Sequence, residues 1–557
     1  MSPEAVTAPL ARRQTRPAGT RARIAAVAPA VVMLALTALA QNAGQPSPFE
    51  TASAPEVKNR VDEIVFASLK RQGYTPARLS SDAVFVRRAY LDVIGTLPTA
   101  DEAQAFIEDR APEKRRALID HLLARGEFAD YWAMKWSDTL RVKSEFPINL
   151  WPNAVQAYHR WIRTAIRDNV PYDRFARELL TASGSNFRDA PVNFYRAVQS
   201  RDPQAIASTV ALTFMGARAD TWPKERLAGM AAFFSRIGYK STGEWKEEIV
   251  YFDPEKAGPA FAPASAGASA RQAGNRVAVF PDGTSVRLES GQDPREVFAS
   301  WLTAPSNPFF ARAAANRAWF WLVGRGIVHE PDDIRSDNPP SHPELLAYLE
   351  RELVAARFDM RHLYRVILNS STYQLSSIPA STPPAPESSF AYALMRPLDA
   401  EVLIDALNQI TGMSEQYSSA IPEPYTFIPP DQRSIALADG SIRSAFLETF
   451  GRPPRDTGLA SERSIQPTAA QRLYLLNSSD VQRKLAQGPK LQALLQRAGG
   501  PRDVVNTLYL TILSRYPTDT EVRAITEHAQ AVGVNRRGAA QDLAWALINT
   551  AEFGYRH

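Results

Sequence analysis

The stretch Tyr90-Leu-Asp-Val-Ile-Gly-Thr-Leu-Pro-Thr-Ala-Asp-Glu102 indicates a helix, a tight turn and a second helix. Thr99 follows Pro98 directly, and Glu102 stands three positions after the threonine. Threonine and glutamate at this spacing form a capping box, in which each side chain accepts a hydrogen bond from the other residue's backbone N–H. The sequence therefore predicts a helix that begins immediately after Thr99.

The same pattern returns near the end of the sequence, in Tyr509-Leu-Thr-Ile-Leu-Ser-Arg-Tyr-Pro-Thr-Asp-Thr-Glu521. The Tyr-Leu pair, the Pro-Thr pair and the glutamate keep their relative positions in both copies. A solenoid needs at least three adjacent repeats, and these two copies lie far apart. We therefore predict one helix-pair unit that is used twice.

Apolar residues at helical spacing fill most of the sequence between and around these units. Val61, Val65 and Leu69 predict one helix, and Tyr131-Trp132 with Trp136 lie on successive turns of another. We interpret these aromatic residues as core residues rather than as a platform for a ligand.

Strand signals are confined to the middle of the sequence. Residues 247–252 are strand-like, residues 253–276 are rich in Ala, Gly, Pro and Ser, and residues 277–288 alternate around a Pro-Asp-Gly turn typical of a hairpin. The predicted fold is mainly α, with two helical domains and a small β insertion with a Pro/Ala/Gly-rich linker between them. The predicted boundaries are 1–40 (signal peptide), 41–56 (flexible leader), 57–240 (N-terminal helical domain), 241–293 (β element and linker) and 294–557 (C-terminal helical domain).

The first 40 residues have the features of an export signal. Five arginines precede an apolar run from Ile24 to Ala40, which ends in Ala-Leu-Ala before the polar Gln41. The alternative is an uncleaved membrane anchor, because about 17 apolar residues is the lower limit of a span. We expect cleavage and a periplasmic or secreted protein, with membrane contact only through an uncleaved signal.

Charge and cysteine content exclude several classes of function. The formal net charge is +5, of which residues 1–40 supply +4 through five arginines and one glutamate, so the remainder carries +1. No clustered positive charge remains for a nucleic-acid partner. The sequence contains no cysteine, which excludes thiolate catalysis, disulfides, Cys-ligated zinc, iron–sulfur clusters and covalent c-type haem.

Several ordered motifs resemble a known pair of domains. Residues 85–99, 114–123 and 171–175 are similar to the cytochrome-associated domain of planctomycete exported proteins (PSCyt2 type). Residues 301–308, 340–346 and 451–456 resemble the planctomycete-specific domain (PSD1 type) that usually follows it. The resemblance covers about residues 57–557 and implies a family of unknown activity.

The sequence departs from that family at two places. The resemblance implies a haem-type CxxCH motif just before Ala231-Ala-Phe-Phe234 and a cysteine-containing stretch before Glu462-Arg-Ser464. This sequence has Phe214–Lys224 at the first place and Gly458–Ser461 at the second, both without cysteine. A redox or haem function of the family therefore does not transfer to this protein.

The most polar segment runs from Asp332 to Glu344. Carboxylates and an imidazole in one loop suit a divalent cation, with Asp332, Asp333, Asp337 and His342 as metal ligands, or general acid–base catalysis by Asp333 and His342. The alternative is structural. Ser341 and Glu344 have capping-box spacing, and Pro343 would occupy the first turn of the helix.

Three arginines are candidates for binding a ligand. Arg317 precedes the aromatic run Trp319-Phe-Trp321, and Arg452 and Arg455 stand in one loop. Guanidinium groups bind flat anions, so these residues suit a carboxylated or sulfated ligand. The alternative is that Arg317 ties a helix to neighbouring carbonyls and that the loop arginines form a salt-bridged network.

These features favour an exported cell-envelope protein that acts as a non-catalytic scaffold or partner. The resemblance implies a link to polysaccharide use, so the expected partner is a polysaccharide or another exported protein, and not nucleic acid. The alternative is a hydrolase with its site at Asp332–Glu344. No cofactor is expected, apart from a divalent metal at that loop.

Overall fold

The computed structural model describes residues 47–256, 276–289, 291–464, 466–497, 499–533 and 535–557. The predicted signal peptide and most of the predicted linker after residue 253 lie outside these residues. Among the helices of the described ranges, none combines the length and the apolar character that a membrane span needs. Residues 47–51, part of the predicted leader, lie beside the start of α3, where Ser81 N donates to Phe49 O and Thr51 N to Leu79 O.

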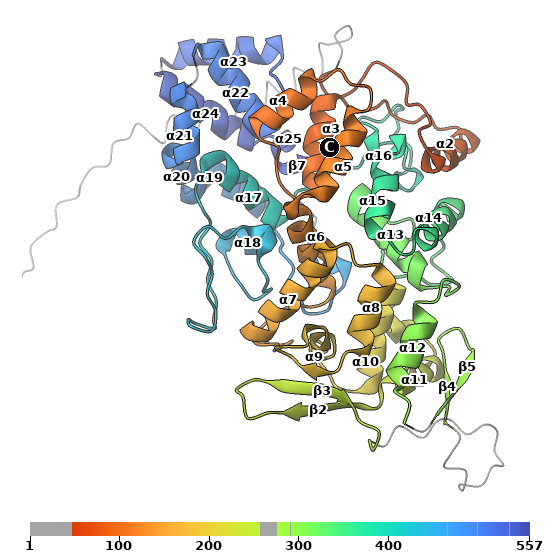
Figure 1. The fold of residues 1–557 in the computed structure, drawn as a ribbon. Coiled ribbons are helices and arrows are strands. Elements are labelled where there is room, and N and C mark those ends of the chain that lie inside the picture. Colours follow the sequence, from red (N-terminus) through yellow and green to blue (C-terminus); the bar gives the residue numbers. More distant parts are fainter. Residues whose placement is uncertain (1–46, 257–275, 290, 465, 498, 534) are drawn as a thin grey trace, which may run out of the picture.

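The first part of the chain folds into helices that extend from the top of the molecule through its centre to the bottom, with the first of them at the right edge (Figure 1). They are α2 (Arg60–Gln72), α3 (Asp82–Val93), α4 (Ala100–Glu108), α5 (Lys114–Ala124), α6 (Gly126–Thr139), α7 (Pro152–Arg167), α8 (Tyr172–Thr181), α9 (Asn193–Arg196), α10 (Pro203–Val210) and α11 (Lys224–Ala231).

Helix α2 shows how local sequence sets an element. Its N-cap Asn59 accepts a hydrogen bond from Val61 N, and its C-cap Gly73 has a left-handed φ of 76°, which glycine adopts without a steric penalty. Val61, Val65 and Leu69 are buried, as their spacing predicted.

Helix α6 runs through the middle of the molecule (Figure 1). Tyr131, Trp132 and Trp136 are at most 5% exposed, which confirms that they are core residues. The Trp132 ring stacks on Tyr364 with centroids 4.3 Å apart, and its Nε1–H donates to Val93 O. Neighbouring helices therefore pack around α6.

The strands form small antiparallel sheets. β1 (Gly184–Ser185), β3 (Glu248–Phe252) and β2 (Ile237–Ser241) pair in that order, and β4 (Arg276–Val279) pairs with β5 (Ser285–Leu288) around the predicted turn. The predicted mainly α fold with a small strand insertion is confirmed.

The second part of the chain is helical again. Its helices are α12 (Pro294–Leu302), α13 (Phe310–Val323), α14 (Pro343–Ala355), α15 (Met360–Leu368), α16 (Ser371–Gln374), α17 (Ala400–Thr411), α18 (Ala445–Thr449), α19 (Ala469–Asn477), α20 (Ser479–Gln487), α21 (Pro489–Arg497), α22 (Pro501–Leu513), α23 (Asp519–Val532), α24 (Arg536–Ile548) and α25 (Ala551–Gly554).

The two copies of the repeated motif form the pairs α3–α4 and α22–α23, and both capping boxes are present. The pairs also lie against each other, with α4 next to α22 (Figure 1). Arg87 donates to Ile512 O at 2.8 Å, and Tyr516 Oη donates to Glu108 at 3.0 Å. The two copies of the repeated unit thus bring an early and a late segment of the chain together.

The final residues return to the middle of the molecule. β7 (Tyr555–Arg556) pairs with β6 (Arg396–Pro397), which places Arg556 beside Asp92 and Asp399. Buried apolar residues from both parts of the chain form one continuous hydrophobic cluster. The two helical parts are therefore packed together rather than joined by a linker alone.

A charged pocket as the candidate functional site

A cavity of about 90 Å³ lies between α6, α13 and the loop that contains Gly458–Ala460. Phe320, Trp321 and Leu459 contribute apolar walls. The charged side chains that line it are Lys135, Asp138, Arg317, Asp332, Arg396, Asp399, Arg463 and Arg556. The pocket therefore draws residues from both helical parts and from β7.

Helical spacing brings the α6 residues to the pocket. Tyr131, Lys135 and Asp138 lie four and three positions apart, so they share one face of the helix. On the opposite wall, α13 ends at Gly324, whose φ is 95°. A Cβ at this position would lie 2.2 Å from Cδ of Arg396. Glycine therefore leaves the space in which the Arg396 side chain lines the pocket.

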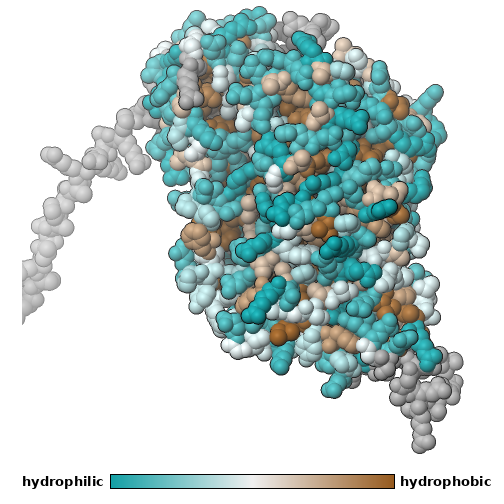
Figure 2. Space-filling model, in the orientation of Figure 1, coloured by the Kyte–Doolittle hydropathy of each residue, from teal (hydrophilic) through white to brown (hydrophobic). Residues whose placement is uncertain are grey.

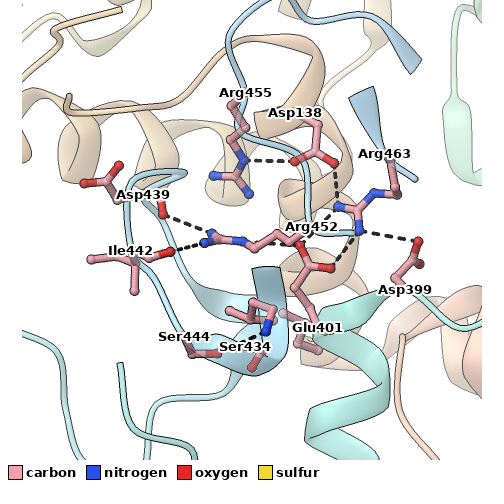
Figure 3. Close-up of polar contacts among 12 residues, drawn as sticks. Asp138, Asp399, Glu401, Ser434, Asp439, Ile442, Ser444, Arg452, Arg455 and Arg463 are labelled. Carbon is pink, nitrogen blue, oxygen red and sulfur yellow. Dashed lines mark hydrogen bonds and ion pairs between the residues drawn. The ribbon is translucent and has the colours of Figure 1, made fainter. Parts of the chain in front are cut away.

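An ion-pair cluster, which we call the junction cluster, consists of Asp138, Glu401, Arg452, Arg455 and Arg463 (Figure 3). Asp138 and Arg463 also line the pocket, so the two features share a wall. Arg463 bonds both carboxylates, with Nη2 at 2.6 Å from Asp138 and Nη1 at 2.7 Å from Glu401. Arg455 Nε donates to the other oxygen of Asp138 at 2.9 Å. The cluster ties α6 to α17 and to the loop at 452–463.

A second group of charges surrounds Asp399. Lys135 Nζ lies 2.9 and 3.0 Å from its two oxygens, and Arg556 Nη2 donates to it at 2.9 Å. Burial alone would raise the pKa of Asp399, but Lys135, Arg556 and Arg463 together hold it well below its usual value. Asp399 is therefore ionised.

The pKa of Lys135 is also lowered, but here burial is the main cause. Burial lowers its pKa to about 8; Asp399 counteracts this effect, whereas Arg463 and Arg556 add to it. A buried ammonium group next to two guanidinium groups loses its proton more easily than one in water. The pocket thus holds a lysine that titrates close to neutral pH.

The predicted ligand residues Arg452 and Arg455 are bonded inside the fold. Arg452 donates to Ile442 O and Asp439 O and lies 3.5 Å from Glu401. Arg455 is fully buried and donates to Asp138 and to Ala438 O. These contacts are those of the alternative interpretation, a salt-bridged loop network.

Arg317 does line the pocket, and it is also a structural tie. Its Nη1 donates to Thr213 O at 2.7 Å and its Nη2 to Leu212 O at 3.1 Å, while the guanidinium lies over the Trp136 ring. These bonds connect α13 to the short π-helix Ala211–Met215. Of the three predicted ligand arginines, Arg317 therefore both lines the pocket and ties two segments of the fold together.

The acidic residues of the Asp332–Glu344 segment point in different directions. Asp332 is buried at the pocket wall and accepts from Ala460 N at 3.1 Å. Asp333 and Asp337 lie on either side of Arg335, at 3.3 and 3.4 Å. Arg335 and the Ala460 amide therefore bond the carboxylates that were candidates for a metal site, while Oδ1 of Asp332 is buried without a hydrogen-bond partner in the described part of the chain.

His342 lies apart from these acids. It is 5% exposed, its Nδ1 lies 3.3 Å from Ser341 Oγ, and its ring packs 5.1 Å from that of Phe390. Burial lowers its pKa, and Arg71 adds to the shift. Across the described ranges, no group of three or more His, Asp or Glu side chains is placed to hold a metal ion. The structure thus does not bring Asp332, Asp333, Asp337 and His342 together.

The predicted capping box at this segment is wrong. Both the backbone N–H and the Oγ of Ser341 donate to Ile327 O, so the serine does not cap the helix. α14 begins at Pro343, as expected for proline in the first turn, and its N-cap is His342 without a side-chain bond. Glu344 pairs instead with Arg60 at 3.1 Å.

Five charged residues of the pocket were not identified from the sequence: Lys135, Asp138, Arg396, Asp399 and Arg556. Their partners are far away in the sequence, and only the Tyr131–Lys135–Asp138 spacing on α6 offered a local signal. The two places where the resemblance implies cysteines both bond the segment Asp332–Ile334. Ala460 N donates to Asp332, and Gly216 O accepts from Ile334 N at 2.8 Å. Gly458–Ala460 also line the pocket.

Comparison with known families gives two matches. Residues 60–236 match PSCyt2, described as a protein of unknown function (DUF1549), and residues 294–529 match PSD1, described as a protein of unknown function (DUF1553). No curated protein and no solved structure matches the chain.

Proposed function

Since the chain belongs to the family in which a PSCyt2 domain precedes a PSD1 domain, both of unknown function, we propose that it is an exported, non-catalytic scaffold of the cell envelope. Its partner in this role is a polysaccharide or another exported protein. The proposal rests on the junction cluster.

The junction cluster supports a structural role for the charges at the centre of the molecule. Glu401 and Arg455 are fully buried, and Asp138, Arg452 and Arg463 are at most 15% exposed at their side chains. These side chains pair with one another and with backbone carbonyls, whereas Nη2 of Arg455 is buried without a hydrogen-bond partner among the described residues. Removing one partner from such a buried set leaves an uncompensated charge, so the set holds the two helical parts in one arrangement.

Export is supported by the N-terminal sequence. The arginine-rich start, the apolar run and the Ala38-Leu-Ala40 ending together form the pattern of a cleaved signal peptide. Cleavage would release a chain that starts near Gln41.

The alternative, a hydrolase at Asp332–Glu344, has less support. A catalytic acid–base pair needs two groups that converge on one reacting position. Here Asp333 and Asp337 face Arg335, Asp332 faces the Ala460 amide, and His342 packs on Phe390. These contacts hold the loop in place and do not direct the candidate groups at one reacting position.

The test is expression of the full chain in a Gram-negative host, followed by fractionation and intact mass. We expect a periplasmic protein that has lost about the first 40 residues and that hydrolyses neither chromogenic glycosides nor sulfate esters. A full-length cytosolic protein would refute the export proposal. Turnover that disappears in His342→Ala and Asp333→Asn, with stoichiometric metal in the wild type, would replace the scaffold by the hydrolase.

A further inference from the structure

Three aromatic rings from distant segments meet at the surface of the protein. Trp151 precedes α7, Trp245 lies in the turn between β2 and β3, and Tyr425 lies in the loop between α17 and α18. The ring centroids are 4.6 Å apart for Trp151 and Trp245, 5.0 Å for Trp245 and Tyr425, and 5.7 Å for Trp151 and Tyr425. We call these residues the aromatic triad.

The triad is not part of the core. Trp245 is 52% exposed and Tyr425 is 45% exposed, so about half of each side chain remains in water. The face of the molecule in Figure 2 is mostly hydrophilic, with apolar residues in small separate groups. Exposed aromatic residues gathered from three segments, rather than scattered singly, indicate a surface that binds something.

The backbone under the triad is strained. Trp151 has φ 74° and ψ 147°, close to a region that only glycine adopts freely, and Asn149 and Lys246 also have positive φ, at 59° and 63°. Left-handed conformations in bulky residues cost free energy and gather at ligand-binding positions. Trp151 and Lys246 are two such residues at one small surface, which is an independent sign that their side chains are held for a purpose; asparagine adopts this region readily.

The strained residues are also fixed by hydrogen bonds. Trp151 N donates to Ser144 O, and Asn186 Nδ2 donates to Lys246 O at 3.1 Å. Ser185 Oγ and Thr242 Oγ1 both donate to Glu247, which holds the strand turn next to Trp245. The rings are therefore presented in a preformed arrangement, which reduces the entropy lost on binding.

Three exposed polar residues, Asn149, Glu244 and Lys246, are close to the rings in the sequence, and we call them the rim. The Lys246 ammonium lies 5.2 Å from the Trp151 centroid and 5.7 Å from that of Trp245. A ligand that fits this surface has a flat C–H face for the electron-rich ring faces and many hydroxyl groups for the amide, ammonium and carboxylate of the rim. A sugar ring has both.

We propose that the aromatic triad Trp151–Trp245–Tyr425 is a binding surface for a carbohydrate chain. This inference builds on the proposed scaffold role, because it assigns the polysaccharide partner to a place on the molecule. Pyranose C–H groups lie on the Trp245 and Tyr425 faces, and hydroxyl groups bond the rim. Lys246 adds attraction for sugars that carry carboxylate or sulfate groups.

The experiment is affinity gel electrophoresis of the exported chain in gels that contain a soluble polysaccharide. Hydroxyethylcellulose and xylan represent neutral chains, and polygalacturonate and chondroitin sulfate represent acidic ones. We expect retardation by at least one of them, weakened about tenfold or more in Trp245→Ala and largely retained in Trp245→Phe. If the ligand is acidic, Lys246→Gln weakens its binding, whereas binding of a neutral chain is unchanged.

Leu473→Ala is the control, since Leu473 is 57% exposed on α19 and lies outside the triad. Because Trp245 lies on an exposed turn, its variants should remain folded. A thermal melt of each variant checks this expectation. Equal retardation of wild type and Trp245→Ala would overturn the inference and leave the scaffold proposal standing. The inference would also be overturned if none of the polysaccharides retarded the protein. The same holds if a gel that contains poly-L-proline retarded the protein and the polysaccharide gels did not. Cytosolic location or hydrolytic turnover would refute the proposed function without changing these gels.

Discussion

Arg463 holds the Glu401 carboxylate with both terminal nitrogens, Nη1 to Oε2 at 2.7 Å and Nη2 to Oε1 at 3.1 Å. The glutamate is fully buried on α17, and the arginine belongs to the loop that also forms the pocket wall. A bidentate pair of this kind fixes direction as well as distance. It therefore sets the position of the loop relative to the helices.

Replacing Glu401 by glutamine should destabilise the protein strongly. The change leaves Arg463 and Arg452 buried with less negative charge, and the loss of one partner from a buried pair costs about 3–5 kcal/mol. Urea unfolding followed by circular dichroism measures the effect. Glu344→Gln is the matched control, because the Arg60–Glu344 pair is more than half exposed, and it should change the free energy of unfolding by about 1 kcal/mol or less. Similar losses in both variants would contradict the role of the junction cluster.

Acid should destabilise the protein below about pH 6.5 through a buried histidine. Burial lowers the pKa of His159 to about 3, and Arg455 and Arg163 add to the shift. Between that pKa and the ordinary value near 6.5, the unfolded chain binds the proton and the folded chain does not. Stability therefore falls as pH falls, by up to about 1.4 kcal/mol per pH unit. His159→Phe should flatten the stability profile between pH 6.5 and 4.5, with exposed His121→Phe as control. Superimposable profiles for wild type and His159→Phe would speak against this explanation.

The capping box of the second helix pair should be measurable by a single substitution. Thr518 accepts from Glu521 N, and its own N–H donates to the Glu521 carboxylate at 2.7 Å. Thr518→Ala should lower the free energy of unfolding by about 1 kcal/mol, whereas Thr518→Ser should restore most of it. Equal losses in the alanine and serine variants would show that the threonine methyl group, and not the cap, matters.

Lys135 should titrate near pH 8. Labelled lysine side chains can be followed by NMR, and the resonance that is lost in Lys135→Gln identifies the group. Its midpoint should lie about two units below the ~10.4 of an exposed lysine, because burial and the nearby arginines disfavour the ammonium form. An anion that enters the pocket should raise this midpoint. A midpoint above 10 in the free protein would mean that Asp399 dominates over burial.

The sequence predicted local features well and long-range partners poorly. The caps at Thr99 and Thr518 and the burial of Trp132 follow from spacing alone, because their determinants lie within one or two helical turns. The Ser341 cap failed because Ile327 O, from another segment, accepts both donors of the serine. The pairing of Arg463 with Asp138 and Glu401 has no signal in residue spacing, since it arises only when three segments pack together.

Asp92 is 2% exposed on α3, and its charge is met by Arg396 and by Arg556 from the other end of the described chain. This buried carboxylate is therefore neutralised only when segments that are far apart in the sequence have come together. Early compaction around α3 would enclose an unpaired charge, which is unfavourable. Burial of α3 in the core is thus coupled to the docking of two arginines from the second helical part.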